Sequence, residues 1–122
     1  MIVNSAGRIR ARIEIPSDKS ISHRSLIFNA IADGPATVER ILDSEDVRST
    51  AACLSALGVE IDWPTGAPVA HIRGNGMHSL FEADDTLDCG NSGTSMRLLL
   101  GLLAGHPILS IQSKKQRIGL VV

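Results

Sequence analysis

The sequence of 122 residues is poor in aromatic side chains, with two Phe, one Trp and no Tyr. Any core must therefore be built from Ile, Leu, Val and Ala, and the length suits one such core but not two independent ones. Long apolar runs are also lacking, since the longest covers residues 98–104. A run this short is far below the roughly 20 residues that cross a bilayer, so we expect no membrane association.

Metal-ligand spacings and a strong net charge are lacking as well. Cys53 and Cys89 are the only cysteines, and neither they nor the four histidines show zinc-ligand spacing. The expectation is reduced thiols in the cytoplasm, with no metal and no signal peptide. The formal net charge of −1 argues against the broadly basic surface typical of proteins that bind nucleic acid.

What the sequence contains is an ordered series of strand and helix patterns. Residues 8–15 alternate apolar and charged side chains with period two, which predicts a strand with one buried face. Further strands are expected at residues 37–41, 59–63, 69–73, 86–89 and 108–111. Helices are expected over residues 19–33, 43–57 and 94–104. The predicted order is β-α-β-α-β-β and then β-α-β, a mixed α/β (α+β) fold in one domain over residues 1–122.

Each predicted helix has an apolar stripe that should face the core. The stripes consist of Ile21, Ser25, Phe28 and Ile31 in the first helix, Val47, Ala51, Leu54 and Leu57 in the second, and Met96, Leu99, Leu100 and Leu103 in the third. Residues 112–122 form a basic and then apolar tail that is atypical of the rest.

The start of the first helix carries side chains suited to an anionic ligand. Lys19 and Ser20 fall in its first turn, where free backbone N–H groups and the helix dipole favour an anion. Arg24 lies four residues after Ser20 and so projects from the same helix face. An ammonium, a hydroxyl and a guanidinium together suit phosphate and carboxylate groups. The alternative is a capped first turn that merely faces solvent.

A glycine-bearing loop at residues 88–97 offers a second candidate for anion binding. It joins a predicted strand to a predicted helix, a layout in which backbone amides can hold an anion. It is neither a Walker loop nor a dinucleotide fingerprint, and a tight turn that needs glycine is the alternative reading. The basic run Lys114-Lys115-Gln116-Arg117 is, by itself, typical of solvated surface.

Three ordered segments together resemble the amino-terminal part of the EPSP synthase family, the 3-phosphoshikimate 1-carboxyvinyltransferases. They are Lys19-Ser20-Ile21-Ser22-His23-Arg24, Leu42-Asp43-Ser44-Glu45-Asp46-Val47-Arg48 and Gly90-Asn91-Ser92-Gly93-Thr94-Ser95-Met96-Arg97. The resemblance runs to about residue 111 and covers the first quarter of a full member, so the chain is truncated relative to the family. It implies βαβαββ units of the inside-out α/β barrel type, of which this chain would hold about one and a half.

The resemblance also implies a cofactor-free reaction of the shikimate pathway of aromatic amino acid biosynthesis. In it, the enolpyruvyl group passes from phosphoenolpyruvate to the 5-hydroxyl of shikimate 3-phosphate, and phosphate is released. Lys19 would then contact both substrates, and Ser20 and Arg24 would hold the carboxylate of the shikimate end. The phosphoenolpyruvate site would be lined by Asn91, Gly93 and Thr94, with Arg97 supporting the loop.

Several positions depart from the family pattern. Ser17 stands where the family usually has Gly, and Leu98 stands where glyphosate-sensitive plant and enteric enzymes carry Pro. Glyphosate is thus an expected ligand only by analogy. The segment around Arg117 looks like the family's Arg-Pro-(Met/Ile)-Gly segment with residues deleted, so Arg117 stands in for its phosphoenolpyruvate-binding Arg. The family's acidic pair for proton transfer has no counterpart here, and we assign no catalytic residue.

Two functional hypotheses from different classes follow. The first is a shortened enzyme that is active through self-association or with a complementary chain. The second is a non-catalytic module that binds phosphate and carboxylate groups without turnover. The related UDP-N-acetylglucosamine enolpyruvyl transferases fit less well, because their helix start does not resemble Lys19-Ser20-Ile21-Ser22-His23-Arg24.

Overall fold

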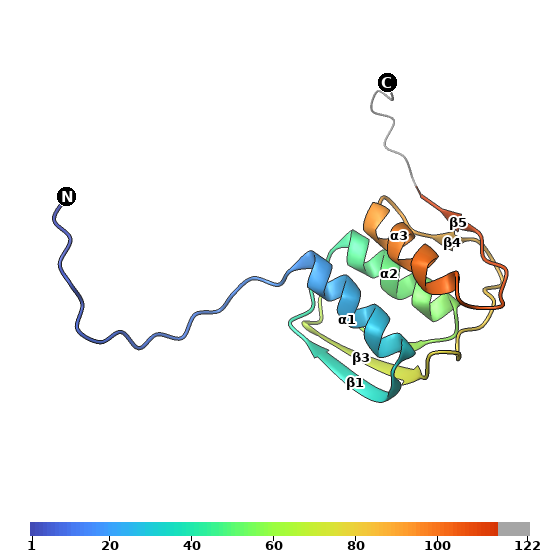
Figure 1. Ribbon diagram of the computed structural model, residues 1–122, viewed down its shortest axis with the longest axis horizontal. Coiled ribbons are helices and arrows are strands. Elements are labelled where there is room, and N and C mark those ends of the chain that lie inside the picture. Colours follow the sequence, from blue (N-terminus) through green and yellow to red (C-terminus); the bar gives the residue numbers. More distant parts are fainter. Residues whose placement is uncertain (115–122) are drawn as a thin grey trace, which may run out of the picture.

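The computed structural model describes residues 1–114. Its elements, in chain order, are α1 (Lys19–Ile31), β1 (Asp33–Glu39), α2 (Glu45–Ala56), β2 (Glu60–Asp62), β3 (Val69–Asn75), β4 (Leu87–Asp88), α3 (Gly93–Leu103) and β5 (Gln112–Ser113). This mixed α/β order confirms the predicted fold class from α1 onwards (Figure 1). No barrel is closed by the part of the chain that the structure describes.

A three-stranded antiparallel sheet forms one layer, with β3 between β1 and β2. Ala70 and Ile72 of β3 are buried, because they point toward the helices, whereas His71 and Arg73 alternate with them and are exposed. Helices α1 and α2 pack on the buried face of this sheet, α3 packs against α2, and α2 also contacts β4 of the short parallel β4–β5 pair (Figure 1). The core is aliphatic, as the composition requires, with Trp63 as its only buried aromatic ring besides the imidazole of His23 among the described residues.

The three helices begin at the same edge of the molecule, the edge where the N-terminal segment leaves it (Figure 1). Each start is capped by a side chain that accepts a hydrogen bond from a backbone N–H of the first turn. Asp18 accepts from Ile21, Ser44 from Val47 and Ser92 from Ser95. Caps of this kind fix where each helix begins, and they also leave the remaining first-turn N–H groups directed outward.

The predicted strand at residues 8–15 is wrong. Residues 1–18 form no strand, and the apolar side chains of the alternating pattern are exposed, at 78% for Ile9, 80% for Ile13 and 73% for Ile15. The segment is held only near its end, where Arg40 donates a 2.6 Å hydrogen bond to the carbonyl of Ile15 and Ser17 Oγ donates to the carbonyl of Arg40. A strand needs a neighbour for its backbone groups and its apolar face, and no described residue lies beside this one to provide them.

The predicted inward stripe of α1 is wrong for Ile21 and Phe28, whereas Ile31 packs against the core and the stripe of α2 is confirmed. Ile21 and Phe28 are 59% and 62% exposed. The helix instead buries Leu26 and Ile27 on a face that also contains Ser22 and His23. Burial of polar side chains is tolerated where they are hydrogen-bonded, and Ser22 Oγ both donates to Asp18 O and accepts from Leu42 N.

Two smaller corrections concern the last third of the chain. Leu100 of the predicted α3 stripe is 54% exposed, whereas Leu99 and Leu103 are buried. The last strand lies at Gln112–Ser113 and not at residues 108–111, so the predicted tail begins inside a strand. Its position is set by pairing with β4, in which Leu87 N–H donates to Ile111 O and Cys89 N–H to Ser113 O.

Two further observations on the described residues concern membranes and metal ions. No helix within residues 1–114 is both long and apolar enough to cross a membrane. The same residues contain no group of three His, Cys, Asp or Glu side chains placed to hold a metal ion.

Candidate functional site

Asp46 connects the starts of all three helices. Its carboxylate lies 2.8 Å from the ammonium of Lys19 at the start of α1. Its backbone carbonyl accepts a 3.1 Å hydrogen bond from Ser95 Oγ in the first turn of α3. Because Asp46 itself lies in the first turn of α2, the positive ends of three helix dipoles meet at one edge.

The predicted residues of α1 are all on its exposed side. Lys19, Ser20 and Arg24 face solvent, and Lys19 keeps a side-chain exposure of 50% despite its ion pair. Arg24 forms no hydrogen bond or ion pair with another residue in the range 1–114. It borders an apolar groove between α1 and α3, whose other lining residues are Ile27, Phe28, Ile31, Leu98 and Leu102.

The glycine loop before α3 has the tight backbone that its sequence predicts. Gly90 has φ +56°, a left-handed conformation that favours glycine, and its N–H donates to Asp88 Oδ1 at 2.8 Å. A Cβ atom on Gly90 would lie 2.7 Å from Ser49 Oγ, so the loop also approaches α2 closely. Asn91 is exposed and lines a hollow against α2.

Two cationic side chains lie over the first residue of α3. A Cβ atom on Gly93 would be 3.3 Å from a terminal guanidinium nitrogen of Arg97 and 3.4 Å from Lys114 Nζ. The absence of a side chain at Gly93 therefore leaves room beside both cations, at the end of a helix where backbone N–H groups face outward. Thr94 follows in the same turn and is partly buried.

Lys114 is the residue that the sequence reading missed. As part of a basic run it indicated only solvated surface, and nothing in the run distinguishes it from its neighbours. Strands β4 and β5 pair in parallel with Asp88 opposite Ser113, and this register places Lys114 beside the glycine loop. Arg117, which the resemblance assigns to phosphoenolpyruvate, lies outside the described residues.

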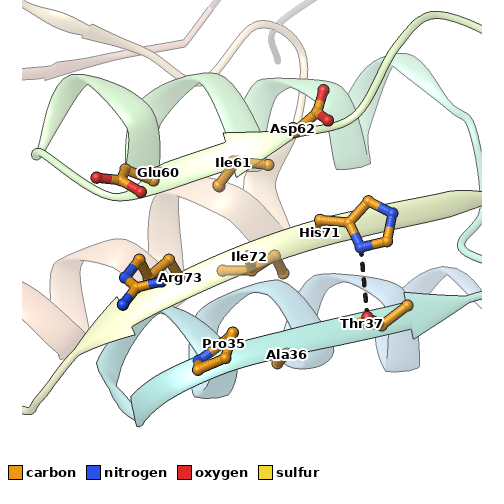
Figure 2. Close-up of a pocket in the computed structure, with 9 residues that line it drawn as sticks. All are labelled: Pro35, Ala36, Thr37, Glu60, Ile61, Asp62, His71, Ile72 and Arg73. Atoms are coloured by element: carbon orange, nitrogen blue, oxygen red, sulfur yellow. Dashed lines mark hydrogen bonds between the residues drawn. The ribbon is translucent and has the colours of Figure 1, made fainter.

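A second hollow lies on the outer face of the three-stranded sheet (Figure 2). Asp62 and Glu60 of β2 stand opposite His71 and Arg73 of β3, and His71 Nδ1 lies 3.3 Å from Thr37 Oγ1. None of the predicted site residues lines it. The hollow has no helix start and mixes both charge signs, so the edge with the three helix starts is the better candidate for an anion.

The arrangement at that edge can hold anionic groups at two places. The side chains placed to bind an anion are Lys19 and Ser20 at the start of α1, and Arg97 and Lys114 at the start of α3. Asp46 contacts both helix starts, through its carboxylate to Lys19 and through its backbone carbonyl to Ser95. The structure thus brings the two predicted segments to one edge of the fold, with α2 between them.

Comparisons with known proteins agree with these features. A family model described as EPSP synthase (3-phosphoshikimate 1-carboxyvinyltransferase) matches residues 3–115. A 3-phosphoshikimate 1-carboxyvinyltransferase from a Synechococcus species is 52% identical over 104 residues, covering 85% of this chain and 24% of the relative. One from Chloroflexus aurantiacus is 53% identical with the same coverage.

A solved structure gives the same result. EPSP synthase from Acinetobacter baumannii superposes with a TM-score of 0.79 at 41% sequence identity, covering 84% of this chain and 23% of that one. The chain therefore spans about a quarter of the length of the relatives it matches. It belongs to the EPSP synthase family and corresponds to the amino-terminal part of a 3-phosphoshikimate 1-carboxyvinyltransferase.

Proposed function

We propose that this chain provides part of the binding site for phosphoenolpyruvate and shikimate 3-phosphate in transfer of the enolpyruvyl group between them. The observation that supports it is the meeting of helix starts and cations at one edge, with Lys19 at α1 and with Arg97 and Lys114 at α3. Both substrates carry a phosphate and a carboxylate, and the reaction needs no cofactor.

The residue roles are those that the family resemblance implies, and the chemistry of each side chain suits them. Lys19 contacts both substrates as a point charge, and Ser20 and Arg24 hold the carboxylate of shikimate 3-phosphate on the exposed side of α1. Lowering the repulsion between two anions and orienting them contributes several kcal/mol to such a transfer.

The glycine loop serves the phosphoenolpyruvate end. Asn91, Gly93 and Thr94 line that part of the site, and backbone N–H groups at the start of α3 face the ligand. Arg97 supports the loop, and Lys114 adds a second cation beside Gly93. Arg117 contributes from beyond the described residues. Glyphosate, as a phosphonate with a carboxylate, would use the same cations.

Turnover would require more than this chain alone. Of the described carboxylates near the site, Asp46 is paired with Lys19 and Asp18 caps α1, while Glu45 lies in the first turn of α2, where the helix dipole accounts for an acidic side chain. We propose that activity depends on self-association or on a complementary chain in the cytoplasm. A non-catalytic binding module is the second candidate, and the engagement of Asp46 and Asp18 by other groups favours it.

An amide NMR titration tests the binding site. Shikimate 3-phosphate, phosphoenolpyruvate or inorganic phosphate should shift the amides of residues 19–24 and 90–97 together. Movement of only one stretch, or of scattered basic residues, would contradict a shared site. A phosphate-release assay with both substrates, on protein freed of the host enzyme, then separates an enzyme from a binding module.

A further inference from the structure

Beneath the candidate site lies a buried chain of side-chain hydrogen bonds that joins the three helices. His23 Nδ1 in α1 lies 2.8 Å from Thr50 Oγ1 in α2, and Thr50 Oγ1 lies 2.7 Å from Ser95 Oγ in α3. Ser95 Oγ is also 2.7 Å from Ser92 Oγ and 3.1 Å from Asp46 O. His23, Thr50 and Ser95 are completely buried.

The hydroxyl protons in this series of hydrogen bonds can be arranged in one way that satisfies every contact. A backbone carbonyl can only accept, so the single proton of Ser95 goes to Asp46 O. Ser95 Oγ must then accept from Thr50, whose only proton is used in this bond. Thr50 Oγ1 must in turn accept from His23, which therefore carries its proton on Nδ1. The same Ser95 hydroxyl also donates toward Ser92 Oγ, so its proton lies between two acceptors and is not available to Thr50.

The other ring nitrogen of His23 agrees with this order. Nε2 is buried and has no hydrogen-bond partner among residues 1–114. A buried, unprotonated Nε2 is an acceptor without a partner, which proteins tolerate. A protonated Nε2 would be a buried donor without a partner, which is rarer in proteins. Burial lowers the pKa of His23, and this effect exceeds the opposing influence of Asp46 and adds to that of Lys19. The imidazole is accordingly neutral at physiological pH.

We propose that His23 is a positioning residue for the anion site, because its neutral Nδ1–H imidazole aligns the start of α1 with the start of α3 through Thr50 and Ser95. The effect on ligand binding rests on the proposed function, whereas the hydrogen-bonded link itself does not. His23 is separated from Lys19 by one helical turn, and Ser95 is one residue from Thr94, so the link connects the two anion-holding segments from below. Each segment would then hold its geometry only while the other is in place.

Long-range ¹H–¹⁵N NMR of the imidazole tests the link without any ligand. We expect His23 to show the neutral Nδ1–H tautomer from pH 8 to below the ordinary histidine pKa of about 6.5. An Nε2–H tautomer, or titration at the ordinary pKa, would overturn the proposed proton order.

Paired variants test the positioning role. His23→Asn can place an amide N–H where Nδ1 lies, whereas His23→Gln reaches toward Nε2 and cannot. In the phosphate titration, His23→Asn should keep the joint response of residues 19–24 and 90–97, and His23→Gln should bind about five- to tenfold more weakly, as expected for one lost buried hydrogen bond. Equal losses in both variants would reduce His23 to a packing role and overturn the proposal.

A second pair at Thr50 keeps the test decisive if the histidine variants do not fold. Thr50→Ser retains the hydroxyl, and Thr50→Val removes it at nearly the same volume. Thr50→Val should weaken phosphate binding as His23→Gln does, and Thr50→Ser should not; the opposite order would overturn the link. If the parent protein itself does not respond to phosphate, the proposed function fails, while the tautomer and the melting temperatures of the two pairs still decide whether the link exists.

Discussion

The ammonium of Lys19 lies 2.8 Å from the carboxylate of Asp46, and this ion pair joins the first turns of two neighbouring helices. Both side chains retain contact with water, at 50% exposure for Lys19 and 27% for Asp46. An ion pair of this exposure contributes little to stability, so its main consequence concerns any anion that approaches Lys19. The carboxylate competes with such a ligand for the same ammonium.

Asp46→Asn should strengthen phosphate binding at the start of α1. The substitution frees Lys19 and removes a negative charge from the site, and we expect a gain of up to about fivefold. The measurement is a calorimetric titration with inorganic phosphate. Glu45→Gln is the matched control, because Glu45 is exposed in the same helix turn and forms no ion pair within residues 1–114. Weaker binding in Asp46→Asn would mean that Asp46 orients Lys19 and does not compete for it.

Asp43 should make the stability of the fold depend on pH in the acid range. Arg48 donates two hydrogen bonds to its carboxylate and Gly66 N–H a third, which lower the pKa of Asp43 from 3.8 to about 2. Because the pKa is lower in the folded state, the stabilisation is present above about pH 4 and is lost as pH falls toward 2. Thermal melts should therefore show Asp43→Asn destabilised at neutral pH and equal to the parent near pH 2.

The control for that pH series is Asp62→Asn. Asp62 lies on the outer sheet face and forms no ion pair with any residue that the structure describes. The melting temperature of the Asp62→Asn variant should follow that of the parent protein through the pH series. A constant gap between the Asp43→Asn and parent curves across the acid range would exclude titration of Asp43 as the cause.

Gly93→Ala should separate anion binding from stability. The new methyl group would lie 3.3 Å from Arg97 and 3.4 Å from Lys114, and the flexible ends of both side chains can move aside. We expect the fold to remain as stable or to gain slightly from better helix propensity. Phosphate binding should fall by about tenfold, because the space beside two cations is filled. Calorimetry and thermal melts together measure both effects.

Gly101→Ala provides the matched control in the same helix. A Cβ atom at Gly101 meets nothing within 4 Å, so the substitution should stabilise α3 by roughly 0.5–1 kcal/mol and leave phosphate binding unchanged. If Gly93→Ala behaves like Gly101→Ala in both measurements, the cations over Gly93 do not form a binding site.

Arg24→Lys should weaken shikimate 3-phosphate binding nearly as much as Arg24→Ala, by about 1–3 kcal/mol. The reason is that a planar guanidinium can bind a carboxylate through two parallel hydrogen bonds, which an ammonium cannot. Stability should change by a few tenths of a kcal/mol, since Arg24 is exposed. Titrations at two ionic strengths decide the matter: if lysine replaces arginine without loss and binding falls smoothly with salt, general electrostatics suffices.

The chain should fold by itself into the α/β domain described here. Three helices with capped starts and one continuous aliphatic core support this expectation. Far-UV circular dichroism should show a mixed helix and strand spectrum, and amide NMR signals should be well dispersed. A coil spectrum, or signals collapsed into a narrow band, would show that the rest of a full-length family member is needed.

The sequence by itself determined the local features whose causes are local. The caps Asp18, Ser44 and Ser92 begin the helices within two residues of the expected starts, since a cap needs only a side chain and the first turn after it. The stripe of α2 is buried as predicted, and Gly58 ends that helix with φ +94°. The three motifs that identify the family are likewise short and contiguous.

The tertiary structure alone decided the features that depend on distant partners. Ser22 and His23 are buried in α1 because Leu42 and Thr50 hydrogen-bond them from 20 and 27 residues away. Lys114 reaches Gly93 only because β5 pairs in parallel with β4, a register that no local pattern shows. Residues 8–15 carry a strand pattern, yet a strand exists only where another backbone accepts and donates its hydrogen bonds.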